Sequence, residues 1–139
     1  MQIYLLLNFL FISYYYVLDG YSSQREYIST QAALVDTVED FWRMVYKERS
    51  TNIVMLTELH DGNQEQCVKY WPSELNEWHE WNMNERQMVA NAELTSEIAI
   101  IKSYEGPAWE GSDGFVTKRT FHIFSSRSNS SQDVSFKLN

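Results

Sequence analysis

The chain has 139 residues and a formal net charge of -8, with 11 Lys and Arg against 19 Asp and Glu. This length fits one modest domain, and 44% hydrophobic with 15% aromatic residues favours a packed core over disorder. The basic residues are scattered, so a nucleic-acid partner, which needs clustered Lys and Arg, is not expected. The single cysteine excludes an internal disulfide and any CxxC metal or redox motif.

The first 18 residues are strongly apolar and carry no charged side chain. Such a segment is compatible with a secretory signal or a membrane anchor, although it has no basic start and Asn8 interrupts it. Two other interpretations stay open. The segment is either a buried strand that leads into a turn at Asp19 and Gly20, or a stretch joined to the rest by an imperfect gene model.

The next segments predict a strand, a helix and a strand. Residues 26–30 are short and β-prone. Over residues 37–48 the apolar side chains recur at intervals of three and four, which predicts an amphipathic helix capped by Asp36 or Thr37. Residues 53–59 form a largely continuous apolar run, typical of a strand covered on both faces. This order indicates an α/β layer.

The second half of the chain is expected to be mostly β-structure. Composition indicates a turn at residues 60–63, a strand at residues 68–71, and an acidic, Trp-rich solvated stretch at residues 74–84. Further strands are expected within residues 92–104, 115–124 and 134–138, with a serine-dense loop at residues 125–131.

Cys67 is the obvious candidate nucleophile, because a thiolate is a strong one. A reactive thiolate needs a helix N-terminus, a cation or a histidine beside it, and a phosphate substrate needs a loop of backbone N–H groups with an arginine. The surrounding sequence, QEQCVKY, has neither a glycine nor an arginine. We therefore predict that Cys67 is a buried structural residue.

A zinc site is the next candidate, and its potential ligands are His60, Asp61, Cys67 and His79. Their spacing fits no closed zinc-site pattern, and one thiol with two separate histidines is a weak set of ligands. Solvated turn residues are the better interpretation.

Clustered acids and tryptophans complete the candidates. The acids are Glu74, Glu77, Glu80 and Glu85, and the tryptophans are Trp71, Trp78 and Trp81. The sequence places no apolar environment around the acids that would raise a pKa for acid/base chemistry, so a solvated face is expected. A stacking platform for bases needs interleaved basic residues, so packing is the better interpretation of the tryptophans. We predict no catalytic, cofactor-binding or metal-binding residue in this chain, and no cofactor.

Five segments in order resemble the protein tyrosine phosphatase family, in which they read DGY, YIATQGPL, TVEDFWRM, IVML and KCxxYWP. The corresponding segments here are residues 19–21, 27–34, 37–44, 53–56 and 66–72. Residues 14–17, 115–121 and 134–138 also look like the family's YINA strand, YxVRxF strand and the strand before its WPD loop. The sequence around Cys67 resembles that of receptor-type phosphatases, and in particular that of their membrane-distal second domains, which are often weakly active or inactive.

Departures from the family pattern occur at two places. Gln31-Ala32-Ala33-Leu34 replaces QGPL, so the glycine and proline of a defined turn are lost. Many active members use an acidic residue and a lysine to order their catalytic loops. Asp61 keeps the acid here, whereas Gln66 replaces the lysine.

The family hydrolyses phosphotyrosine in proteins with a cysteine nucleophile in an HCxxGxxR loop and an aspartate in a WPD loop. Neither motif occurs in this sequence, and the KNRY segment that grips phosphotyrosine is also missing. The resemblance therefore implies a catalytically inactive fragment of a phosphatase domain, with an incomplete α/β fold of a mixed, twisted sheet and a flanking helix. The alternative is a non-catalytic, pseudophosphatase-like interaction module.

We divide the chain into an N-terminal segment, residues 1–18, and a partial phosphatase domain, residues 19–139. The resemblance implies phosphotyrosine proteins as partners and a cytoplasmic location, with anchoring through residues 1–18 as the alternative. Without the strand that leads into the cysteine loop and the helices after it, we expect unpaired strand edges and bare apolar surface near residues 53–56, and hence self-association.

Overall fold

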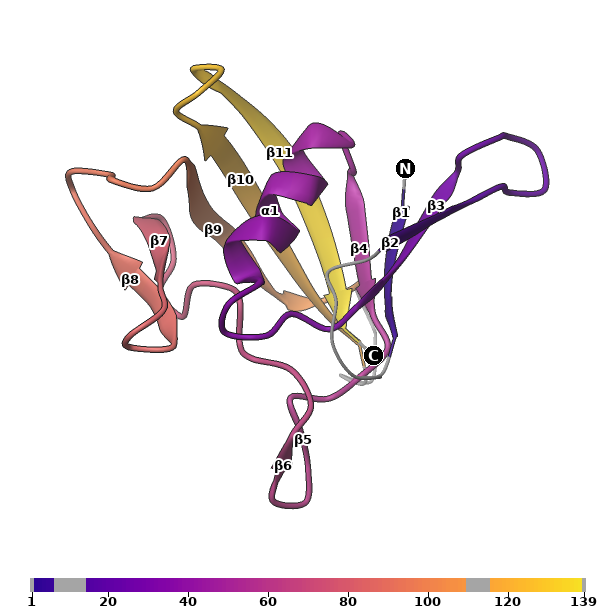
Figure 1. Ribbon diagram of the computed structural model, residues 1–139, viewed down its shortest axis with the longest axis horizontal. Helices are drawn as coiled ribbons and strands as arrows, with labels where there is room; N and C mark the ends of the chain where they lie inside the picture. Colours follow the sequence, from indigo (N-terminus) through magenta and orange to yellow (C-terminus); the bar gives the residue numbers. More distant parts are fainter. Residues whose placement is uncertain (1, 7–14, 110–115, 139) are drawn as a thin grey trace.

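The computed structural model describes residues 2–6, 15–109 and 116–138. In this part of the chain, nine strands form one sheet in the order β2-β3-β1-β4-β11-β10-β9-β7-β8, and β5 pairs with β6 in a separate hairpin (Figure 1). The elements are β1 Gln2–Leu6, β2 Tyr15–Leu18, β3 Tyr27–Gln31, α1 Val38–Lys47, β4 Asn52–Met55, β5 His60–Asp61, β6 Gln64–Glu65, β7 Trp78–Asn82, β8 Gln87–Ala90, β9 Ile98–Pro107, β10 Thr117–Ser125 and β11 Ser130–Leu138. The described chain is thus mostly sheet with one short helix.

The sheet is mixed, as expected from the sequence. β1 lies parallel to both β3 and β4, with Ile3 opposite Ile28 and Ile53, and β4 is parallel to β11. The remaining pairs are antiparallel. β1 and β11 flank β4, so the prediction of unpaired strand edges beside residues 53–56 is wrong.

The predicted helix is confirmed as α1, which buries Val38, Phe41, Trp42 and Val45. Thr37 occupies the N-cap position, but its side chain does not cap the helix. Its hydroxyl accepts the backbone N–H of Leu34 at 2.9 Å instead. The expected side-chain cap is therefore wrong, because Thr37 stabilises the turn that enters the helix.

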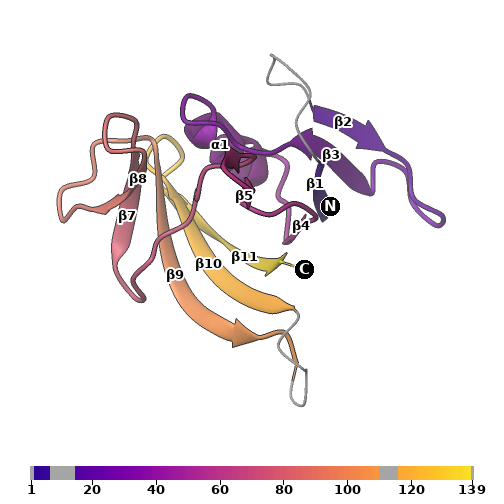
Figure 2. The same cartoon turned by 90° about the horizontal axis from the view of Figure 1, so that it is seen from below.

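The core lies between α1 and one face of the sheet. The Trp42 ring contacts those of Phe41, Tyr70 and Phe121 edge-on, with centroids 5.4–5.8 Å apart. The opposite face carries no helix in the described part of the chain (Figure 2). Helix packing thus defines the buried face.

The expectation that residues 53–59 form a strand covered on both faces is wrong. β4 ends at Met55, and burial alternates along it: Ile53 and Met55 are fully buried, whereas Val54 is only partly buried. Leu56, just after the strand, is 46% exposed. The bare apolar surface predicted around residues 53–56 is therefore limited to Leu56, with Val54 partly covered and Ile53 and Met55 buried.

Residues 68–71 were expected to form a strand, but they form an irregular segment in which every side chain except that of Lys69 is buried. The backbone N–H of Val68 donates to the carbonyl of Ala33 at 3.1 Å, so this segment packs on the loop that replaces QGPL. Ala32 and Ala33 are both buried there. The small side chains allow close packing without the family's glycine and proline.

The other strand predictions hold in outline. The strand structure expected within residues 92–104 is one long strand, β9, which runs on to Pro107. β10 covers residues 117–124 of the strand predicted over residues 115–124, and β11 covers residues 134–138. Of the predicted turn at residues 60–63, only residues 62–63 form the turn, which joins β5 to β6, whereas residues 60 and 61 form β5. The hairpin of β7 and β8 was missed, and Phe115 lies outside the described residues.

The apolar N-terminal segment contains β1 and β2, and residues 7–14 lie outside the described residues. Tyr16 and Leu18 of β2 are exposed, so the buried-strand interpretation is wrong for this part of the segment. β2 stands at the edge of the sheet, where its outer side has no neighbouring strand among the described residues. Within residues 2–6, 15–109 and 116–138, no helix has the length and apolarity to cross a membrane.

Candidate functional site

Cys67 lies in the loop after β6, and its side chain is only 1% exposed. The thiol donates to the backbone carbonyl of Val68 at 3.3 Å. Burial, partly opposed by a backbone hydrogen bond at Ala33, raises the pKa of the Cys67 thiol to about 12. The predicted burial of Cys67 is confirmed, and this environment disfavours a thiolate.

Slow reaction of Cys67 with a thiol reagent is the expected result in native buffer at pH 8. With a pKa of about 12, only about one thiol in ten thousand is ionised at that pH. Labelling in denaturant should be fast. Absorbance or mass spectrometry follows both reactions, and equally fast labelling in the two buffers would contradict an inert, buried Cys67.

The potential zinc ligands are not brought together. His60 and Asp61 are exposed on β5, where they pair across the hairpin with Glu65 and Gln64. His79, which was expected in a solvated turn, is instead buried on β7, and its Nδ1 lies 2.9 Å from the carbonyl oxygen of Glu77. No group of three or more potential ligands forms a metal site among the described residues.

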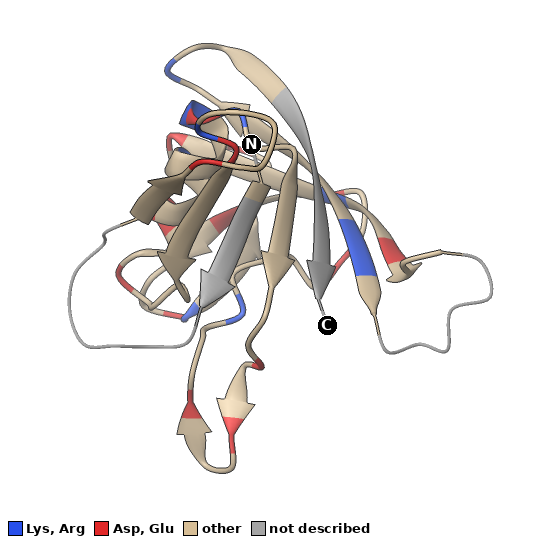
Figure 3. Cartoon of the chain, turned by 90° about the vertical axis from the view of Figure 1, so that its right-hand side faces the viewer, with Lys and Arg blue, Asp and Glu red and all other residues tan. Residues whose placement is uncertain are grey.

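Asp61 and Gln66, the two positions compared with the family's loop-ordering pair, lie on and just after the β5–β6 hairpin. Both strands of this hairpin carry an acidic residue, Asp61 and Glu65 (Figure 3). Glu65 accepts a 2.8 Å hydrogen bond from Arg86 of the β7–β8 turn, while Gln66 donates its backbone N–H to Leu59. Asp61, the acidic residue shared with the family pattern, is solvent-exposed.

Glu80 contradicts the expectation of a solvated acidic face. It is 6% exposed, and its carboxylate accepts hydrogen bonds of 2.8–2.9 Å from Asn91, Ser96 and, twice, Thr95. Burial alone would raise its pKa, but these hydrogen bonds outweigh burial and lower the pKa of Glu80 to about 2. Glu80 is therefore an anionic anchor for the 91–96 loop. The other three glutamates, Glu74, Glu77 and Glu85, are exposed as expected.

The three tryptophans pack within the fold, as expected. Trp71 is buried beneath the guanidinium of Arg119, whose carbon lies 4.8 Å from the ring centroid. Trp81 donates its indole N–H to the carbonyl of Val35 at 2.8 Å. The Trp78 ring lies 6.0 Å from that of Phe124. These contacts spread the rings among different neighbours, so they form no common platform.

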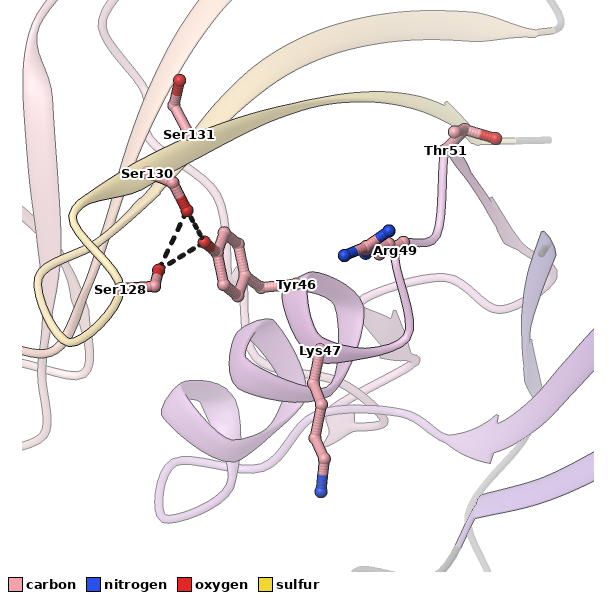
Figure 4. A pocket seen from close by; sticks show the side chains of 7 residues that line it. All are labelled: Tyr46, Lys47, Arg49, Thr51, Ser128, Ser130 and Ser131. Carbon is pink, nitrogen blue, oxygen red and sulfur yellow. Dashed lines mark hydrogen bonds between the residues drawn. The ribbon is translucent and has the colours of Figure 1, made fainter.

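A polar pocket lies between the end of α1 and the β10–β11 turn, with a volume of about 590 Å³ (Figure 4). Its lining residues are Tyr46, Lys47, Arg49, Thr51, Ser128, Ser130 and Ser131. The Tyr46 hydroxyl lies 2.5 Å from Ser128 Oγ and also hydrogen-bonds with Ser130, and the two serine oxygens are 3.0 Å apart. Hydrogen bonds with Ser128 and Ser130, together with the charge of Arg49, lower the pKa of Tyr46.

This pocket was not predictable from the sequence. Residues 125–131 were expected to be a serine-dense loop, but only residues 126–129 connect the strands, because Ser125 ends β10 and Ser130 begins β11. The contact between Tyr46 and Ser130 spans 84 residues of the chain. No local spacing pattern marks such a pairing.

Comparison with known proteins now identifies the family. Residues 8–122 match the family model described as Protein-tyrosine phosphatase. The chain therefore belongs to the protein-tyrosine phosphatase family, as its sequence motifs predicted.

Its relatives include receptor-type enzymes. Over 57 residues, 41% of this chain, it is 51% identical to human (Homo sapiens) receptor-type tyrosine-protein phosphatase alpha, of which this stretch covers 7%. Over the same length it is 53% identical to mouse (Mus musculus) receptor-type tyrosine-protein phosphatase F and 51% identical to chicken (Gallus gallus) receptor-type tyrosine-protein phosphatase S, covering 3% and 4% of those proteins. The chain thus matches only a small part of these relatives' length.

Proposed function

We propose that this chain is a non-catalytic part of a receptor-like phosphatase domain, in a family whose reaction is hydrolysis of phosphotyrosine in proteins. The observation that carries the proposal is the burial of the Cys67 thiol. The chain has one cysteine, and burial raises its pKa to about 12, so the thiolate that a cysteinyl-phosphate mechanism requires is scarce at neutral pH.

The surroundings of Cys67 support the same conclusion. Its thiol hydrogen-bonds to a backbone carbonyl, which is an acceptor and does not stabilise a thiolate. Phosphoryl transfer also needs positive charge and backbone N–H donors that converge on the phosphate. The HCxxGxxR and WPD sequences that supply these groups in the family do not occur in these 139 residues.

The test is turnover of an aryl phosphate by the purified chain. We expect a rate equal to that of a buffer blank, for the unmodified chain and for Cys67→Ser alike. A rate above the blank that persists through repurification and disappears in Cys67→Ser would identify Cys67 as a nucleophile and overturn the proposal.

The second candidate function is a pseudophosphatase-like interaction module that binds phosphotyrosine proteins. The polar pocket beside α1 favours it, because Arg49 and five hydroxyl-bearing residues line it. We propose a cytoplasmic location, which suits a free cysteine, with anchoring through residues 1–18 as the alternative. We also keep residues 1–18 and 19–139 as the proposed division, with β1 of the first part joined to the sheet of the second.

A further inference from the structure

The pocket beside α1 differs in charge from the rest of the molecule. The whole chain carries a net charge of -8, yet the seven lining residues include Lys47 and Arg49, five hydroxyl-bearing residues and no carboxylate. In Figure 4 the Lys47 side chain points away from the Tyr46 ring and the serines, whereas the Arg49 side chain lies across the Tyr46 ring from Ser128 and Ser130. Of the two lining cations, Arg49 is the one on the side of Tyr46, and its charge acts on the Tyr46 hydroxyl.

Arg49 also differs from the other arginines. The other five, Arg25, Arg43, Arg86, Arg119 and Arg127, each form an ion pair with a glutamate. Among the described residues, Arg49 makes no ion pair, and its side chain is exposed. An unpaired guanidinium is a ready partner for an added oxyanion.

The backbone holds Arg49 in this position. It follows α1 with a φ of +52°, a left-handed conformation that turns the chain at the helix end. The C-terminus of a helix carries partial negative charge, which disfavours an anion. Here, however, the last carbonyls of α1 accept the backbone N–H groups of Glu48, Arg49 and Ser50 at 2.9–3.1 Å, so they are already satisfied.

Hydroxyl groups supply the second feature of an oxyanion site. Tyr46, Ser128 and Ser130 form a triangle in which each hydroxyl hydrogen-bonds with the other two. A hydroxyl is both donor and acceptor, and its proton rotates to suit its partner. Each of the three hydroxyls can therefore redirect its proton toward an anion without movement of the backbone.

We propose that this pocket binds a phosphate monoester or inorganic phosphate, with Arg49 supplying the charge and the Tyr46, Ser128 and Ser130 hydroxyls donating hydrogen bonds. This proposal deepens the second candidate function and rests on it, because it names the ligand class of that pocket. Binding here requires no thiolate, so it is independent of whether the chain turns over phosphate esters.

The test is a titration of the isotope-labelled full chain, followed by NMR at constant ionic strength. The probes are inorganic phosphate, the phosphotyrosine amino acid and unphosphorylated tyrosine, with NaCl as the salt control because screening alone shifts exposed charges. We expect saturable shifts at Tyr46, Arg49, Ser128 and Ser130 with both phosphates and none with tyrosine. Tighter binding of phosphotyrosine than of phosphate indicates a phosphorylated side chain as ligand, and equal or weaker binding indicates the free ion.

Arg49→Gln should weaken phosphate binding at least tenfold, and Ser130→Ala about threefold, in keeping with the loss of a charge-assisted or a neutral hydrogen bond. Arg86→Gln is the matched control, since Arg86 is also exposed and also has a positive φ, of +57°. It should bind phosphate within twofold of the unmodified chain. NMR shifts with phosphate no larger than those with NaCl would overturn the proposal, and so would equal losses of phosphate affinity in Arg49→Gln and Arg86→Gln. If a variant fails to fold, the titration of the unmodified chain still decides the question.

Discussion

Trp42→Ala is expected to lower the free energy of unfolding by about 3–5 kcal/mol, the range for large aromatic truncations in protein cores. Trp42 belongs to α1 and is 1% exposed, and its side chain lies between the helix and the sheet. Its ring packs edge-on against three other aromatic rings, so removing it opens a cavity that rigid neighbours cannot close. The change also removes the indole N–H that donates to the carbonyl of Tyr70 at 2.8 Å, leaving a buried acceptor without that bond.

Chemical denaturation measures this effect, and two variants separate its causes. Trp42→Phe keeps an aromatic ring but loses the N–H donor and part of the volume, so we expect a smaller loss of about 1–3 kcal/mol. Trp109→Ala is the matched control because Trp109 is 58% exposed, and its loss should stay within about 0.5 kcal/mol. Equal stabilities of Trp42→Ala and Trp109→Ala would show that the α1 face is not the core in solution.

The helix and its buried face were predictable from the sequence because both depend on local spacing. Phe41, Trp42 and Val45 recur with the helical period, and all three are buried in α1. The β-prone composition of residues 26–30 likewise predicted β3 within a residue, and the apolar run from Ile53 predicted the start of β4 within a residue. Local periodicity did not predict which face of β4 is covered, because cover depends on α1 packing on one face only.

The sequence did not predict the roles of His79 and Glu80 for a related reason. A Trp-rich, acidic stretch has the composition of a solvated surface, yet β7 lies between β8 and β9 in the sheet and buries both side chains. The donors that stabilise the Glu80 carboxylate come from residues 91–96, and no short motif links them to Glu80. The polar pocket was missed in the same way, since α1 and the β10–β11 turn meet only in the folded chain.

Glu80→Gln is expected to reduce stability by about 3 kcal/mol at pH 7, and this loss should shrink in acid. The folded-state pKa of about 2 lies roughly 2.5 units below the reference value of 4.5, and each unit corresponds to about 1.4 kcal/mol. Because the folded pKa is depressed, the ionised carboxylate contributes its full stabilisation above about pH 4.5. That contribution falls as the pH drops toward 2, where the folded-state carboxylate also becomes protonated.

The measurement is urea denaturation of both chains at pH 7, 4 and 3. The free-energy difference between the unmodified chain and Glu80→Gln should narrow from pH 7 to pH 3, because Glu80 of the unfolded chain binds a proton below about pH 4.5, whereas glutamine does not titrate. A residual difference is expected in acid, since the amide group of glutamine places a donor against the N–H groups of Thr95 and Ser96. Glu74→Gln is the control, because Glu74 is exposed and its replacement should change stability by less than about 0.5 kcal/mol at any of these pH values. A Glu80→Gln difference that stays constant from pH 7 to pH 3 would mean that Glu80 stabilises the 91–96 loop by shape alone, without the charge-assisted hydrogen bonds that lower its pKa.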